Sequence, residues 1–261
     1  MELATFIQSS RVPDERGVSP ITCGWIQKDG IARQIHVYLK SLPVEELLNE
    51  FFGAAIARKH GLATPNTYLV SCPCTDLPLL PGVPLGDGQK ALFGSEDTNA
   101  VSLAVRAGKN AEKITALLRA LQSTGSYGAI VALDEWLANV DRHIGNLLAT
   151  GEGKIILIDH GRLFGGPSIR NHELAPAESY RNRFIEALRA TLPKSKVAEV
   201  IEEVEAFCTS VPTTSFDDLL DQYGTPLQVA PSELAILKAF LTNRAPHTVR
   251  LVRQQMLAAT A

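Results

Sequence analysis

The sequence has 261 residues, of which 45% are hydrophobic and 20% charged, with a formal net charge of −3. This length allows one full core or two modest lobes, and the slightly acidic balance argues against a chain that binds nucleic acid non-specifically. No apolar stretch approaches the ~20 residues of a membrane span, no secretory signal opens the chain, and four cysteines do not form a disulfide framework, so we expect a cytoplasmic protein.

The first predicted elements are two β-strands joined by a tight turn. ITCGWIQ and RQIHVYLK, residues 21–27 and 33–40, contain many β-branched and aromatic side chains, and the Asp-Gly pair of the turn KDG, residues 28–30, is a strong hairpin signal. Apolar residues then recur at helical spacing between a proline and a glycine, which predicts a helix over residues 43–61. NTYLVSC, residues 66–72, is typical of a further strand.

The pattern of elements changes after this point. Residues 75–94 are rich in Pro, Gly and Leu without periodicity, and we interpret them as a connection between two lobes. Beyond them a short β-hairpin is predicted at residues 146–159, and the remaining elements are helices at residues 110–122, 127–139, 180–191, 196–209 and 232–261.

These elements predict an α+β protein with two lobes and a cleft between them. Residues 1–75 would form a small β-rich N-lobe with one helix. Residues 76–261 would form a larger, mainly helical C-lobe.

Three polar side chains near the hairpin are the first sign of chemistry. Asp141 and Asn146 lie on the polar loop that follows the helix at 127–139, and Asp159 comes directly after the aliphatic strand IILI. The hairpin between these loops would bring them together, and carboxylate and amide oxygens are ligands that Mg²⁺ prefers. Phosphoryl transfer needs such a site, so the pattern favours a phosphotransferase.

Lys40 and Glu50 add the second half of this pattern. Lys40 ends a predicted strand, where alternation can direct its ammonium group into the cleft, and Glu50 lies off the main apolar stripe of the following helix. In kinases a strand lysine binds the nucleotide phosphates and is held by a helix glutamate.

The residues resemble the HipA-like kinases, and more distantly the phosphoinositide kinases. DRHIGN at 141–146, a hairpin and IDHG at 158–161 are similar to the catalytic and metal-binding segments of that family. RGVSP at 16–20, the strand ending in Lys40 and NEFFGAAIARKHGLATP at 49–65 are similar to its N-lobe. The turn DHG replaces the DFG of eukaryotic protein kinases, and the front loop has no G-x-G-x-x-G.

The resemblance implies a protein-kinase-like fold that uses ATP and Mg²⁺. Lys40, held by Glu50, would bind the nucleotide phosphates. Asn146 and Asp159 would bind the metal.

The resemblance also implies the groups that act on the acceptor. Asp141 would be the catalytic base or would orient the acceptor hydroxyl, and His143 is the alternative base. Ser19 would lie in the loop that covers the phosphates and is a candidate for phosphorylation.

Taken singly, each of these residues has an ordinary structural explanation. Asp141 to His143 could form a helix C-terminal cap with a surface ion pair, and Asn146 and Asp159 could be turn residues. Their joint order and spacing favour a kinase-type site. We therefore expect an ATP- and Mg²⁺-dependent kinase that phosphorylates a serine or threonine hydroxyl on a protein. A small-molecule or phosphoinositide-type lipid kinase and a nucleotide-binding pseudokinase are the alternatives.

Overall fold

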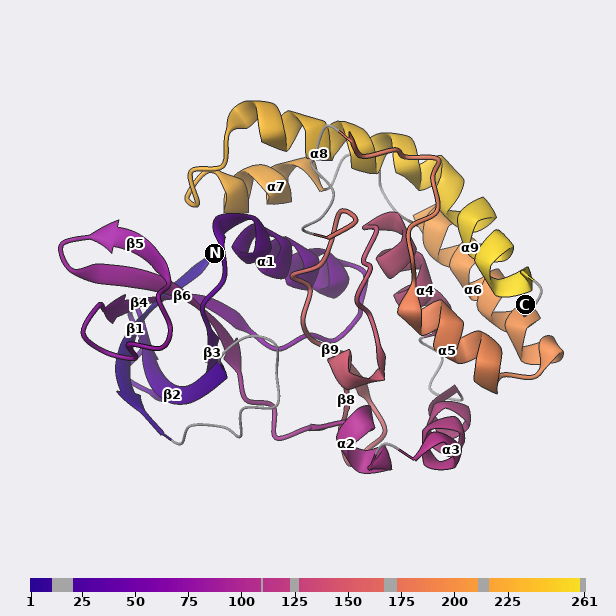
Figure 1. The fold of residues 1–261 in the computed structure, drawn as a ribbon, viewed down its shortest axis with the longest axis horizontal. Helices are drawn as coiled ribbons and strands as arrows, with labels where there is room; N and C mark the ends of the chain where they lie inside the picture. Colours follow the sequence, from indigo (N-terminus) through magenta and orange to yellow (C-terminus); the bar gives the residue numbers. More distant parts are fainter. Residues whose placement is uncertain (11–20, 109, 123–126, 167–172, 211–215, 259–261) are drawn as a thin grey trace.

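The computed structural model describes residues 1–10, 21–108, 110–122, 127–166, 173–210 and 216–258. A β-rich part formed by the first third of the chain lies beside a helical part formed by the rest (Figure 1). Ser19, the predicted phosphorylation candidate, lies outside the described residues.

The β-rich part is a six-stranded sheet that closes on itself. The strand order is β3-β2-β1-β4-β6-β5, and an additional antiparallel pairing joins β3 to β6, so five of the strands form a ring with β5 attached outside it. Among the described strands of this sheet, β1 and β4 are the one pair that runs parallel. The strands are β1 (Glu2–Ser9), β2 (Ile21–Lys28), β3 (Gln34–Lys40), β4 (Thr67–Pro73), β5 (Val83–Gly86) and β6 (Gln89–Glu96).

The alternation of β3 shows how the ring is filled. Val37 and Leu39 are fully buried, whereas Tyr38 between them is exposed and Lys40 is intermediate. Since successive side chains of a strand point to opposite faces, the first pair faces the interior of the ring and the second pair faces outward. The interior forms a separate core made of Ala4, Phe6, Ile26, Val37, Leu39, Tyr68, Val70, Cys72, Leu80 and Leu92.

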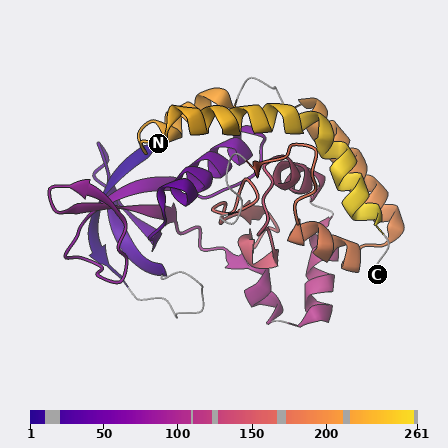
Figure 2. The same ribbon diagram turned by 45° about the horizontal axis from the view of Figure 1, so that its top comes forward.

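The helix α1 (Val44–Lys59) joins the β-rich part to the helical part. Glutamates in its first turn and basic residues in its last turn complement the helix dipole, and Gly61 ends it with a φ of +75°. The Phe51 ring stacks on Tyr223 of α7 (Asp217–Gly224) with centroids 5.9 Å apart. In Figures 1 and 2 α7 and α8 (Pro231–Arg244) lie along α1. The apolar side of α1 thus belongs to the core of the helical part.

The helical part contains a small second sheet and the remaining helices. The sheet has the order β7-β8-β9, with β7 at Val101–Ser102, β8 at Leu147–Ala149 and β9 at Ile155–Leu157, and the 3-10 helix η1 (Ile144–Asn146) leads into β8. The remaining α-helices are α2 (Leu103–Ala107), α3 (Ala111–Gln122), α4 (Tyr127–Trp136), α5 (Arg183–Thr191), α6 (Lys194–Ser210) and α9 (Thr248–Leu257).

The interpretation of residues 75–94 as a connection between lobes is wrong. This segment contains β5 and most of β6, which belong to the same sheet as β1 to β4. Strand β6 is buried on both faces, so its sequence has no period-two alternation. The Asp87-Gly88 turn before it gave no distinct hairpin signal, because Gly82 and Gly86 lie close to it in the sequence. The sheet therefore extends to Glu96.

The other predicted elements can be compared with the helices and strands of the structure. The hairpin and helix of the first lobe, the strand β4 and the β8–β9 hairpin are confirmed. Strand β1 and the short helices α2 and α7 were not predicted, and the helix expected at 232–261 is divided by the 3-10 helix η3 (Ala245–His247), which contains Pro246. The helix α5 begins at Arg183 because the Asn182 side chain caps it.

A buried ion pair joins α4 to α8. The Glu135 and Arg244 side chains are 1% and 0% exposed, and Arg244 Nη2 lies 2.6 Å from Glu135 Oε1. Arg244 also donates to the backbone carbonyls of Pro176 and Glu178. This one guanidinium therefore holds the segment that precedes α5 against the helical core.

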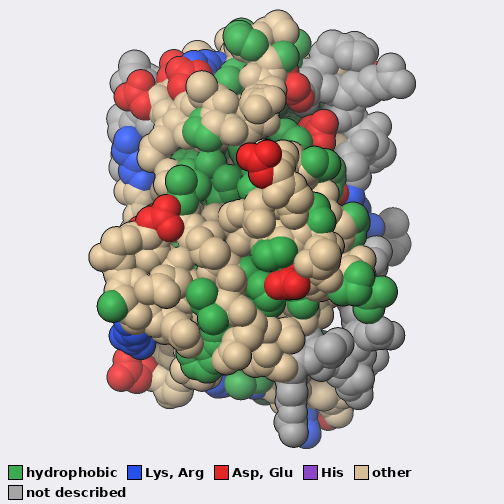
Figure 3. Space-filling model, turned by 90° about the vertical axis from the view of Figure 1, so that its left-hand side faces the viewer, with side chains coloured by type: hydrophobic (Ala, Val, Ile, Leu, Met, Phe, Trp, Pro, Cys, Tyr) green, Lys and Arg blue, Asp and Glu red, His purple; other side chains and the backbone are tan. Residues whose placement is uncertain are grey.

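Apolar side chains are scattered over the outside of the sheet. Leu3, Leu79 and Leu85 are at least half exposed, and the face in Figure 3 shows apolar groups separated by polar atoms and backbone. Among the described residues no helix is long and apolar enough to cross a membrane. Cys23, Cys72, Cys74 and Cys208 are all free thiols.

Replacing Arg244 by alanine is expected to lower the free energy of unfolding by about 3–5 kcal/mol, because Glu135 then keeps a buried charge without its partner. Urea unfolding of the purified variant measures this loss. Lys238→Ala is the control on the same helix: Lys238 pairs with the exposed Asp221, so its loss should be under about 1 kcal/mol. Equal losses in the two variants would contradict the structural role of Arg244.

Candidate active site

Lys40 lies at the meeting point of three segments. Its ammonium nitrogen is 3.3 Å from Glu50 Oε1 on α1 and 3.1 Å from Asp159 Oδ1 in the turn after β9. The lysine side chain is 14% exposed. Burial opposes its charge, but the two carboxylates outweigh this effect and raise the pKa of Lys40, so the ammonium form is retained.

Helix α1 holds the turn formed by residues 159–161. Glu50 is 2% exposed, and its Oε2 accepts a hydrogen bond of 2.8 Å from the His160 backbone N–H. One residue earlier, Asn49 Nδ2 donates to the Gly161 carbonyl at 3.0 Å. Burial raises the pKa of Glu50 to about 7, against the opposing effect of Lys40. Two adjacent helix residues thus fix the backbone on which Asp159 sits.

Asp159 adopts an uncommon backbone conformation with a φ of +61°. Its carboxylate is 41% exposed, in contrast to the nearly buried Glu50. Burial of part of the group favours the neutral form, but the charge and hydrogen bond of Lys40 dominate and lower the pKa of Asp159. The side chain is therefore an accessible anion at neutral pH.

His160 is the middle residue of the turn formed by residues 159–161. Its ring is buried, and desolvation followed by the nearby positive charges lowers its pKa well below the usual range. A Cβ on Gly53 of α1 would lie 2.6–2.9 Å from three His160 side-chain atoms, so glycine provides the space for the ring. A neutral imidazole packed on α1 thus anchors this turn.

Arg142 connects the loop after α4 to the end of β9. It is completely buried, and its Nε is 3.0 Å from Asp134 Oδ2. Its Nη1 donates to the Asn146 carbonyl at 3.3 Å and to the Ile158 carbonyl. The explanation of Asp141 to His143 as a cap with a surface ion pair does not hold for Arg142, because this guanidinium is an interior bridge.

Side-chain hydrogen bonds shape the loop that carries Asp141. The Asp141 backbone N–H donates to Asn139 Oδ1 at 3.1 Å, and Asn139 Nδ2 donates to Asp134 at 2.8 Å. From the other end of the loop, Asn146 Nδ2 donates to the Asp141 carbonyl at 2.9 Å. The buried Asn146 amide thus keeps its oxygen as the acceptor available for other partners.

The His143 ring is held by the loop that follows it. Its Nδ1 accepts a hydrogen bond of 2.9 Å from the Gly145 backbone N–H. Burial is the main cause of a lowered pKa for His143, with Asp141 opposing and Arg183 adding to this effect. A neutral ring whose Nδ1 accepts a bond carries its proton on Nε2.

The Asp141 carboxylate contacts a residue that is distant in sequence. Its Oδ1 lies 2.5 Å from Nη1 of Arg183, the first residue of α5, and the two side chains are 36% and 42% exposed. This ion pair lies at the surface of the molecule. It was not expected from the sequence.

A cleft of about 630 Å³ lies between the β-rich part and the β8–β9 hairpin. Ile21 and Phe93 of the large sheet and Leu157 of the hairpin give it apolar walls, and Lys40 and Asp159 are also among its lining residues. An apolar slot that contains a cation and an anion has the character of a small-molecule binding site.

A hydrogen-bonded chain leads to Asp97, one of the residues that line the cleft. His36 Nε2 is 2.9 Å from Ser10 Oγ, and His36 Nδ1 is 3.1 Å from Asp97 Oδ2. Asp97 belongs to the segment that leaves β6 and also lines the cleft. The chain of bonds thus ties the ends of β1 and β6 to β3.

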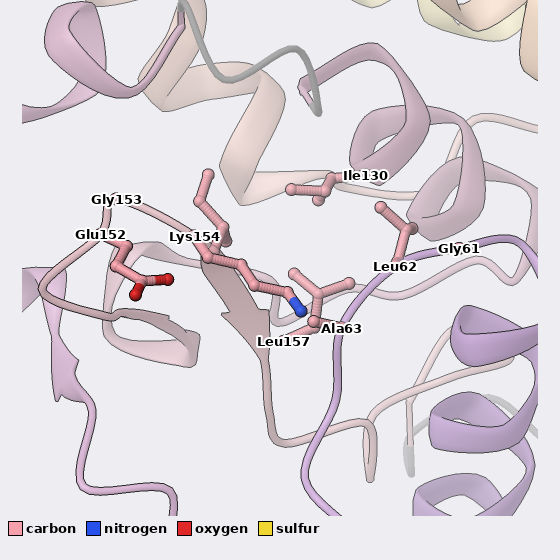
Figure 4. Close-up of a pocket in the computed structure, with 9 residues that line it drawn as sticks. Gly61, Leu62, Ala63, Ile130, Glu152, Gly153, Lys154 and Leu157 are labelled. Carbon is pink, nitrogen blue, oxygen red and sulfur yellow. The ribbon is translucent and has the colours of Figure 1, made fainter.

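A second hollow of about 300 Å³ shares Leu157 with the cleft, but Lys40, Glu50 and Asp159 are not among the residues that line it (Figure 4). Leu62, Ile130 and Leu157 contribute apolar walls, Glu152 lies at the hairpin turn, and Lys154 extends its ammonium group toward Ala63. The Leu157 N–H donates to the Ala63 carbonyl at 2.8 Å beside it. This hollow marks the junction between the hairpin and the end of α1 rather than the site of chemistry.

The donors around Asp159 fit a magnesium ion. Among the described residues no group of three or more His, Cys, Asp or Glu side chains is arranged to hold a metal. Mg²⁺ does not need such a group, since one or two side chains usually bind it together with substrate phosphates. Asp159 offers an accessible anionic carboxylate and Asn146 an amide oxygen, and both are hard ligands.

Comparison with known proteins supports one fold. No protein-family model and no curated protein matches the sequence. Among solved structures, the crystal structure of a Helicobacter pylori proinflammatory kinase, CtkA, is similar over 98% of this chain and 99% of its own, with a TM-score of 0.58 and 13% sequence identity. The chain therefore shares its fold with a kinase. At 13% identity this likeness concerns the fold alone.

The structure brings most of the predicted residues together. Lys40, Glu50 and Asp159 are in direct contact, and Asp141 and Asn146 are linked within one loop that also carries His143. The sequence reasoning missed the residues that position them, namely Asn49, Gly53, Asp134, Asn139, Arg142, His160 and Arg183. The adjacent letters of DRH and DHG were the available signal for Arg142 and His160.

Gly53→Ala is expected to lower the free energy of unfolding by about 1–3 kcal/mol, because the added methyl group overlaps the His160 ring. Urea unfolding of the purified variant measures this loss. Gly151→Ala is the matched control: a Cβ there meets open space, so its effect should stay within about 0.5 kcal/mol. A Gly53→Ala variant as stable as this control would refute the close contact.

Proposed function

We propose that the chain is an ATP- and Mg²⁺-dependent phosphotransferase with a two-lobed, protein-kinase-like arrangement. The observation that carries this proposal is the contact of Lys40 with both Glu50 and Asp159 beside an apolar cleft. A lysine held in this way is placed to bind phosphates, and the cleft has room for a nucleotide. The kinase CtkA, with the same fold, supports the reaction class.

Each side of the cleft has a role in this proposal. The walls formed by Ile21 and Phe93 would take the nucleotide base, and Lys40 would bind the phosphates. Asp159 and Asn146 would hold Mg²⁺, which neutralises charge on the transferred phosphoryl group when bound. Before nucleotide binds, Asp159 instead pairs with Lys40. Nucleotide phosphates would take over the lysine and release the carboxylate for the metal.

Asp141 is the better candidate for the group that accepts the acceptor proton. Its carboxylate is accessible, and its backbone is fixed by Asn139 and Asn146. In His143 the Nδ1 lone pair is occupied by the Gly145 N–H, so the neutral ring has no free basic nitrogen. We assign His143 to shaping the loop and Asp141 to orienting and deprotonating the hydroxyl.

The acceptor we propose is a serine or threonine hydroxyl on a protein, in the cytoplasm. The exposed setting of Asp141 supports a large acceptor, because 36% of this side chain is open to solvent. Ser19 remains a candidate for phosphorylation in this proposal.

Asp159→Ala is expected to lower phosphoryl transfer at least 100-fold while the chain stays folded. Purified protein is incubated with γ-labelled ATP and magnesium, alone and with a cytosolic extract. Label on the protein itself or on one extract band, lost in the variant, supports a protein kinase. Label on small molecules alone would favour a metabolite or lipid kinase, and binding of ATP without any transfer would favour a pseudokinase. Full activity of the variant would refute the role of Asp159.

The two candidate bases can be separated by substitution. Asp141→Asn should lower kcat by about 10²–10⁴, the usual contribution of a general base, whereas His143→Asn should cost less than tenfold. Asparagine keeps an acceptor near the Nδ1 position, so the bond from Gly145 can be retained. His143→Ala, which removes that acceptor, should lose more activity than His143→Asn. A greater loss in His143→Asn than in Asp141→Asn would reverse the assignment.

A further inference from the structure

Arg183 reaches the proposed catalytic aspartate from another part of the chain. Its Nη1 lies 2.5 Å from Asp141 Oδ1, although 42 residues separate the two. The position of Arg183 is fixed, because the buried Asn182 accepts hydrogen bonds from the N–H groups of Phe184 and Ile185 and so sets the start of α5. The contact is therefore built into the fold.

The start of α5 carries an excess of positive charge. Arg181 donates to both carboxylate oxygens of Glu186, at 2.9 and 3.0 Å. The Arg181 hydrogen bond, and then the charges of Arg181, Arg183 and Arg189, lower the pKa of Glu186. Since Arg183 also pairs with Asp141, these residues comprise three guanidinium groups and two carboxylates, in a protein whose net charge is −3. An incoming anion would be attracted to this face.

Arg183 has the capacity to bind an anion while it contacts Asp141. A guanidinium group has five N–H donors in a planar fork, and its geometry suits two-point binding of a carboxylate or phosphate. The side chain is 42% exposed, so these donors face solvent as well as Asp141. Exposed ion pairs of this kind exchange partners readily.

We propose that Arg183 selects acceptors in which an anionic group, a carboxylate or a phosphate, lies close to the hydroxyl. This inference rests on the proposed function and names its substrate class. With the hydroxyl on Asp141 and the anion on Arg183, the two groups lie within about 10 Å, the span of three extended residues. The partner is therefore an acidic or already phosphorylated protein segment.

The reaction at this site balances without a further reactant. A bond forms between the acceptor oxygen and the γ-phosphorus, and the bond from that phosphorus to the β,γ-bridging oxygen breaks. The hydroxyl proton goes to the Asp141 carboxylate, and ADP leaves. The anion bound to Arg183 takes no part in the bond changes, so Arg183 acts on acceptor choice.

The test uses the full chain, ATP and magnesium with a set of synthetic peptides. Each peptide has one serine in a neutral sequence and one variable residue, placed from three residues before the serine to three after it. The variable residue is Glu, phosphoserine, Gln or Lys. We expect kcat/KM to be at least tenfold higher for Glu or phosphoserine than for Gln at one position or more. The Glu and phosphoserine arms distinguish the two sources of the anion.

Variants at Arg183 test whether this residue is the cause. Arg183→Gln should lose the preference, Arg183→Lys should keep part of it, and Arg183→Glu should favour the Lys peptide. Arg253→Gln is the control, since Arg253 is an exposed, ion-paired arginine of α9 and its loss should change nothing. Thermal unfolding and ATP affinity, measured for each variant, show that the fold and the nucleotide site are retained.

The outcomes separate this inference from the function on which it rests. Equal transfer to Glu, Gln and Lys peptides, or a preference that survives in Arg183→Gln, would overturn the role of Arg183 and leave the kinase proposal standing. A wild-type chain that transfers phosphate to no peptide, to no site of its own and to no water molecule would overturn both.

Discussion

The proposed active site depends on a positive charge that is buried without access to water. Arg142 is enclosed between Asp134 and the backbone carbonyls of Asn146 and Ile158. Loss of these partners would leave a buried charge unpaired and lower the stability of the fold by several kcal/mol. All of the partners must therefore stay in place. The end of α4, the loop with Asp141 and the end of β9 therefore behave as one unit. The positions of the polar side chains on both loops follow from this constraint.

Helix α1 imposes a second constraint from the opposite side. It contributes Glu50 to the lysine, and with Asn49 it fixes the backbone of the turn that carries Asp159. The same helix packs its aromatic side chains into the core of the helical part. Lys40 of the β-rich part and Asp159 of the helical part thus meet beside α1. The contact between Lys40 and Asp159 depends on the seating of α1 for this reason.

The sequence predicts those site residues whose positions are set by a neighbouring helix or strand. Lys40 at a strand end, Glu50 on the next helix and Asp159 after a hairpin could be predicted, because each is placed by a neighbouring element with a clear pattern. Burial of Arg142 could not be predicted, since an arginine is usually exposed and only tertiary packing determines whether it is enclosed. The contact of Arg183 with Asp141 gave no local signal either.

The closure of the large sheet could not be predicted from the sequence either. The β3–β6 pairing joins segments more than 50 residues apart in the sequence, and no local sequence pattern predicts it. This closure gives β3, β2, β1 and β4 a neighbour on both sides over part of their length, so within the described residues of this sheet β5 is the strand with a neighbour on one side alone. That strand has four residues and includes Pro84, which has no N–H to donate. Such an edge is a poor template for strands of other molecules, so the ring resists aggregation by edge-to-edge association.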